Sequence, residues 1–75
     1  MGKLPRPTGK EMVRFLERRG FTCTRIHGSH HYMVGGTMHC AVPVHGNENL
    51  RIGTLRHILR TIEMTPEEFE RLWHL

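Results

Sequence analysis

A short turn near the middle of the chain, Gly28-Ser29-His30, carries the clearest potential for chemistry. An unperturbed imidazole has a pKa of about 6.5, so His30 can accept or donate a proton at neutral pH. Cleavage of RNA by transesterification needs such a group, because the 2′-hydroxyl of the substrate is itself the nucleophile. Gly28 would let the backbone turn, and Ser29 would close the turn or donate to a phosphate. The turn therefore predicts metal-independent RNA cleavage with His30 as general acid or base.

His45 is the second candidate acid or base in the sequence. It follows Pro43 and precedes a polar loop at 46–49, from which a side chain can reach a ligand. If His30 and His45 converge on one phosphate, one acts as base and the other as acid, and activity depends on pH through a bell-shaped curve. The sequence does not show whether the two side chains converge. The alternative for each is an ordinary exposed histidine without a catalytic role.

The charge of the chain favours a polyanionic ligand. Eleven lysines and arginines face seven glutamates and no aspartate, which gives a formal net charge of +4. Basic residues recur at four-residue spacing in two stretches that we expect to be helical, so they would line helix stripes able to follow a phosphate backbone. The alternative is that these stripes are solvated helix faces. The predicted RNA-contacting residues are Lys10, Arg14, Arg18, Arg25, Arg51, Arg56 and Arg60.

Seven histidines and two cysteines also raise the question of zinc. No Cys-x-x-Cys pair or paired histidine motif occurs, and alternation along a strand would put His39 and Cys40 on opposite faces. We therefore expect no metal and no cofactor. Cys23 and Cys40 are too few for a disulfide framework and are expected to be small buried hydrophobes in a reducing cytoplasm. No apolar run approaches the length of a membrane span, so no membrane partner is expected.

Three helices are expected within one domain, residues 1–75, because a chain of 75 residues can bury only one core. A capping box at Thr8 predicts a helix over 9–19. An apolar stripe over 52–62 predicts a second helix, with Arg51 at its mouth, where an anion would be favoured. A proline directly after Thr65 predicts the start of a short third helix.

Three β-prone stretches separated by glycine turns lie between the first two helices. They predict a three-stranded antiparallel meander over 22–27, 30–34 and 38–44. Helices over one face of this sheet would make a two-layer α+β fold with the opposite face free. Strict alternation divides the first strand into two sets, one of Cys23, Arg25 and His27 and the other of Thr22, Thr24 and Ile26.

Two ordered sets of residues, taken together, resemble the signature of the HicA toxin family. The first set is Gly20, Phe21, Arg25, Gly28, Ser29 and His30, and the second is Val42–His45, Glu48, Leu50, Gly53–Arg56, Ile58 and Leu59. The resemblance spans residues 8–72. It implies a fold similar to a double-stranded RNA-binding domain, with the order α-β-β-β-α and a short C-terminal helix.

The resemblance also implies a function. This would be an mRNA endoribonuclease of a toxin–antitoxin pair, with His30 as the catalytic histidine and Gly28 and Ser29 as its presenting turn. A HicB-type antitoxin would bind the toxin and cover the active site. Two other interpretations stay open: a noncatalytic RNA-binding module of the same fold, and a domain whose basic surface binds an acidic protein.

Overall fold

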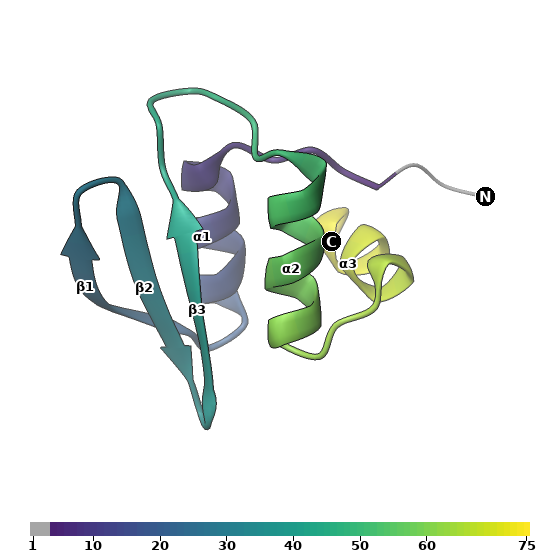
Figure 1. The fold of residues 1–75 in the computed structure, drawn as a ribbon. Coiled ribbons are helices and arrows are strands. Elements are labelled where there is room, and N and C mark those ends of the chain that lie inside the picture. The colour runs from purple at the N-terminus through teal and green to yellow at the C-terminus, as the bar shows by residue number, and fades with distance from the viewer. Residues whose placement is uncertain (1–3) are drawn as a thin grey trace.

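The computed structural model describes residues 4–75, which form a three-stranded sheet covered on one face by helices (Figure 1). The elements in chain order are α1 (Gly9–Arg18), β1 (Thr22–His27), β2 (His30–Gly35), β3 (Met38–Pro43), α2 (Ile52–Thr61) and α3 (Pro66–Trp73). The strands pair antiparallel in the order β1-β2-β3. This arrangement confirms the predicted α+β fold, which is compatible with that of a double-stranded RNA-binding domain.

The predicted helix signals are present as hydrogen bonds. The Thr8 hydroxyl accepts from the Glu11 N–H at 3.2 Å, and the Glu11 carboxylate accepts from the Thr8 N–H at 2.9 Å. Thr65 and Glu68 form the same capping box at the start of α3. These reciprocal bonds satisfy donors that the first turn of a helix leaves free, so local sequence is sufficient to start both helices. The first helix ends at Arg18, one residue before the predicted end.

The sheet differs from the prediction within β1. Cys23 pairs with Met33 and Arg25 pairs with Tyr32, which leaves Thr24 as the extra residue of a β-bulge. Met33 is fully buried under the helices, so Cys23 lies on the helix-facing side, while Arg25 shares the open face with Tyr32. His27 pairs with His30 on that same open face.

The predicted division of β1 into two faces is therefore wrong. Cys23 is separated from Arg25 and His27, and Thr22 is likewise separated from Ile26. The physical reason is that a bulge inserts one residue and reverses the alternation of side chains beyond it. Arg25 consequently joins the face that holds His30.

One apolar core fills the space between the sheet and the helices. Its fully buried members come from α1, β2, β3, α2 and α3, and are Met12, Phe15, Leu16, Met33, Val42, Leu55, Ile58, Leu59 and Phe69. The Phe69 ring meets the Phe15 ring edge-on at 5.0 Å, which fastens α3 to α1. The core thus holds the helices to one face of the sheet and leaves the other face open (Figure 1).

The start of α1 lies unusually close to the end of β3. A Cβ atom built on Gly9 would overlap the Pro43 carbonyl oxygen and lie 2.8 Å from the Val44 Cα. Only glycine permits such an approach between a helix and a strand end without displacing backbone. Gly9 therefore fixes the position of the segment that leads to His45.

Candidate functional site

The start of β2 and the end of β3 meet at one corner of the sheet, where the chemical groups predicted from the sequence gather. The Val44 N–H donates to the Ser29 carbonyl at 2.7 Å, so the ladder between the two strands continues past Pro43. The His45 Nε2 atom lies 3.5 Å from the Ser29 Oγ atom. His30 pairs with Pro43, two residues before His45. The fold therefore brings His45 to Ser29, the residue next to His30.

His30 is exposed on the open face of the sheet at this corner. Its ring centroid lies 6.5 Å from that of Tyr32 on the same face. His31 has the opposite parity and is half-buried on the helix-facing side. Gly28 adopts a φ of 61°, a left-handed conformation that favours glycine, so it forms the tight turn that presents His30.

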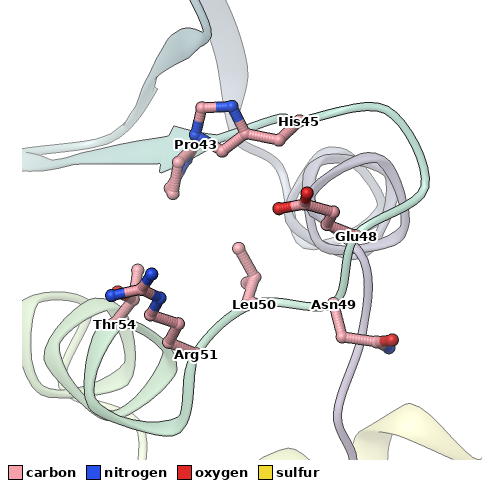
Figure 2. Close-up of a pocket in the computed structure, with 7 residues that line it drawn as sticks. All are labelled: Pro43, His45, Glu48, Asn49, Leu50, Arg51 and Thr54. Carbon is pink, nitrogen blue, oxygen red and sulfur yellow. The ribbon is translucent and has the colours of Figure 1, made fainter.

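A cleft of about 390 Å³ opens between the β3–α2 loop and the first turn of α2. Figure 2 shows His45 on one side of this cleft and Arg51 on the other, with the Leu50 side chain between them. Leu50 is only 4% exposed and forms an apolar floor. Glu48 places a carboxylate at the loop end of the cleft. The cleft thus combines a titratable imidazole, a fixed cation and a carboxylate around an apolar base.

The loop that carries the cleft is tied to the segment before α1. The Arg6 guanidinium donates to the Leu50 carbonyl at 3.3 and 3.2 Å, and the Leu50 N–H donates to the Pro7 carbonyl at 2.8 Å. The Asn49 side chain donates to the Arg6 carbonyl, and the Asn49 backbone pairs with Thr8. These long-range bonds hold the end of the loop, directly before Arg51, although it lies outside regular structure.

The electrostatics on the Arg51 side of the cleft suit an anion. Arg51 is the N-cap residue of α2 and makes no capping hydrogen bond with its side chain, and the first turn of α2 holds no acidic residue. The positive end of the helix dipole and the Arg51 guanidinium therefore act in the same direction. Phosphate is the anion that this combination fits in a nucleic acid.

A comparison with known protein families decides the identity of the chain. The family model for the HicA toxin of bacterial toxin–antitoxin pairs matches residues 9–64 of the 75. The chain belongs to the HicA toxin family. It is accordingly a toxin that pairs with an antitoxin. No curated protein matches the chain.

The HicA match extends from the start of α1 to the residues after α2. It includes the whole sheet, the corner with His30 and His45, and the cleft. The third helix lies outside the matched range. The features that could do chemistry thus all belong to the part of the chain shared with other HicA toxins.

The seven basic residues predicted to contact RNA are exposed in this HicA toxin, and they lie on several different elements. Arg51 lines the cleft, and the Arg25 guanidinium lies over the Tyr32 ring on the open face, 4.6 Å from its centroid. Arg56 and Arg60 border a small hollow beside the start of α3. The remaining three, on α1, are Lys10, Arg14 and Arg18. The structure therefore brings Arg51 to the corner and Arg25 to the adjoining face.

Tyr32 and Glu48 are the site residues that sequence reasoning did not single out. Tyr32 follows His30 by two residues, so strand alternation alone would have placed both on one face. Glu48 belongs to the residues that resemble the HicA signature, but sequence reasoning assigned it no role, because its position in the cleft depends on how the loop folds. The open face and the cleft therefore gain a ring and a carboxylate, respectively, that the sequence analysis lacked.

The cysteines take no part in this site. Cys23 and Cys40 are half-buried, less than predicted, on the helix-facing side of the sheet and pack against the core. Burial raises the pKa of the Cys40 thiol to about 11, so it stays protonated and weakly reactive at neutral pH.

Within residues 4–75, no three potential ligands gather to hold a metal ion. No helix in the same range is long and apolar enough to cross a membrane.

Proposed function

We propose that this HicA toxin is an endoribonuclease that cleaves single-stranded mRNA in the cytoplasm by acid–base catalysis at His30. One observation carries the proposal: exposed His30 and the Ser29–His45 contact occupy the same corner of the sheet. Two imidazoles near one phosphate are sufficient for transesterification without a metal. The cleft beside the corner adds the Arg51 cation.

The reaction would proceed through the groups of the corner. The imidazole of either His30 or His45 removes the 2′-hydroxyl proton, and the 2′-oxygen attacks the adjacent phosphorus. The bond from phosphorus to the 5′-oxygen breaks, and the other imidazole protonates the leaving oxygen. The products are a 2′,3′-cyclic phosphate and a 5′-hydroxyl. Ser29 would orient His45, and Arg51 would stabilise the charge that develops on the phosphate.

A HicB-type antitoxin would inhibit this activity by covering the corner. His30 and His45 are both exposed, so a protein bound there would exclude RNA. Mapping the residues that become protected from solvent in the toxin–antitoxin complex tests this point directly. We expect protection of the β1–β2 turn and of the β3–α2 loop.

The deciding experiment compares wild-type protein with His30→Ala on an end-labelled single-stranded RNA, with EDTA present. General acid–base groups contribute roughly 10²- to 10⁴-fold to rate, so we expect His30→Ala to lose cleavage by at least about 10²-fold. His74→Ala is the matched control, because it removes an exposed imidazole beyond α3. Cleavage by folded His30→Ala at the wild-type rate would refute the assignment.

A noncatalytic RNA-binding module is the second candidate function. The exposed basic stripe on α1, made by Lys10, Arg14 and Arg18, favours it because such a stripe binds phosphates without cleaving them. In that case RNA would stay intact with wild-type protein, and its affinity would fall steeply with added salt.

A further inference from the structure

The open face of the sheet has a chemistry that the proposed cleavage does not yet use. Figure 1 shows α1, α2 and α3 on the opposite side of the strands. A shallow hollow of about 520 Å³ lies over β1, β2 and β3, and its lining includes Arg25, Tyr32, Val34, His39 and Ala41. This face is therefore hollowed and accessible, and it adjoins His30.

The charge of this face favours an anionic ligand over a neutral or cationic one. The chain holds no acidic residue between Glu17 and Glu48, so none of the three strands contributes a carboxylate. Arg25 supplies a permanent cation, and His27, His30 and His39 share the face with it. The sheet is thus positive or neutral over its whole open surface.

The shape of the side chains favours an unpaired base. The planar Arg25 guanidinium lies 4.6 Å from the centroid of the Tyr32 ring, and Tyr32 as a residue remains half-exposed. Proteins recognise single-stranded RNA by stacking its bases on aromatic rings and arginine planes. Tyr32 lies two residues from His30 along the same face, about 7 Å at the usual rise of a strand. A base stacked at Tyr32 would therefore lie beside a phosphate at His30.

We propose that Arg25 and Tyr32 form a stacking platform that holds one unpaired RNA base next to the phosphate cleaved at His30. The proposal rests on the proposed ribonuclease function and gives its preference for single-stranded RNA a physical basis. Bases within a duplex are stacked on their neighbours and cannot reach the platform, so the platform selects single-stranded RNA. Tyr32 acts as a positioning residue and takes no part in proton transfer.

The test measures binding by fluorescence anisotropy in a His30→Ala background, which keeps the RNA intact. Two labelled probes of equal length and charge are compared: a single-stranded oligoribonucleotide and an oligomer that lacks its bases. We expect Tyr32→Leu to weaken binding of the RNA by roughly 5- to 150-fold and to leave binding of the baseless oligomer unchanged. Tyr32→Phe keeps the ring and should bind like the parent protein.

Two further variants make the test robust to any loss of stability. Ala41 pairs with Tyr32 on the open face, so Ala41→Glu adds a carboxylate beside the platform and should weaken binding of both probes. Arg25→Ala should weaken RNA binding more than Arg71→Ala, which removes an equal charge from α3 on the far side of the helices. Circular dichroism confirms that each variant is folded.

The outcomes separate this proposal from the proposed function. Unchanged RNA affinity in folded Tyr32→Leu and Ala41→Glu would overturn the platform and leave the face to a protein partner. An equal loss for both probes in Tyr32→Leu would also overturn it, because stacking requires bases. Cleavage by the wild-type protein is measured independently on a gel. Cleavage without an effect of Tyr32→Leu on binding would overturn the platform alone, and intact RNA with that effect present would overturn the ribonuclease assignment.

Discussion

Ser29 and His45 are 16 residues apart in the sequence, yet their side chains approach within 3.5 Å. This contact gives His45 a neighbour that can orient its ring and places a second imidazole beside the turn that presents His30. At the scale of single residues, the question is whether both imidazoles transfer protons. If both do, the cleavage rate depends on pH through two titrating groups, one acting as acid and the other as base.

Replacing His45 with alanine tests its role as the second proton-transfer group. We expect kcat/KM for RNA cleavage to fall by roughly 10²- to 10⁴-fold, and the bell-shaped pH profile to lose one of its two limbs. The pH profile is essential because a merely structural change would lower the rate without removing a limb. His57→Ala is the matched control, since it removes an exposed imidazole from α2. A profile with both limbs intact in His45→Ala would exclude His45 from the reaction.

At the scale of elements, the corner depends on how closely α1 approaches β3. Gly9 begins α1, is buried and packs against the end of β3, and the loop after β3 is tied back to the segment before α1. The β-bulge at Thr24 has a comparable effect on β1, because it turns Arg25 onto the face of His30. Packing between elements therefore sets the site more than any single element does.

Replacing Gly9 with alanine tests the close approach of α1 and β3. The added methyl group would overlap the Pro43 carbonyl, so we expect the free energy of unfolding to fall by about 1–3 kcal/mol. Gly53→Ala is the matched control, because nothing lies within 4 Å of a Cβ at that position in α2. It should be neutral or stabilise the protein by up to about 1 kcal/mol, since alanine is the better helix former. Urea denaturation of the two variants measures the difference, and equal stabilities would refute the close packing.

At the scale of the whole molecule, the charge is distributed unevenly over the fold. The acidic residues lie on α1, in the β3–α2 loop, after α2 and on α3, whereas the strands carry none. The sheet is therefore the surface best placed to attract RNA, and Arg51 adds a cation in the cleft. The basic residues on α3 and at its end should contribute little.

The salt dependence of RNA binding tests this distribution. Each phosphate contact on single-stranded RNA contributes about 0.7 to the slope of log affinity against log salt concentration. We expect Arg51→Ala to reduce the slope by about that amount, because it removes one contact in the cleft. Arg71→Ala should leave the slope unchanged. Anisotropy titrations in the His30→Ala background at several salt concentrations give both slopes, and equal slopes for the two variants would remove Arg51 from the interface.

Much of the fold was predictable because its signals are local. The capping boxes at Thr8 and Thr65, the glycine turn at Gly28 and the apolar stripe of α2 each act within a few residues of sequence. They establish the element order and the three-stranded meander without knowledge of distant contacts. The identity of His30 as the candidate acid or base also follows from its turn and from the resemblance to HicA toxins.

The parts that the sequence did not determine depend on contacts between distant residues. Nothing local to β1 indicates the bulge at Thr24, because the register is set by packing of Cys23 and Met33 beneath the helices. The cleft likewise depends on distant contacts, because the segment before α1 is hydrogen-bonded to the end of the β3–α2 loop at Leu50. Local hydrogen bonding and periodicity thus determined which elements form, and tertiary packing decided that His45 meets Ser29 and that Arg25 shares a face with His30.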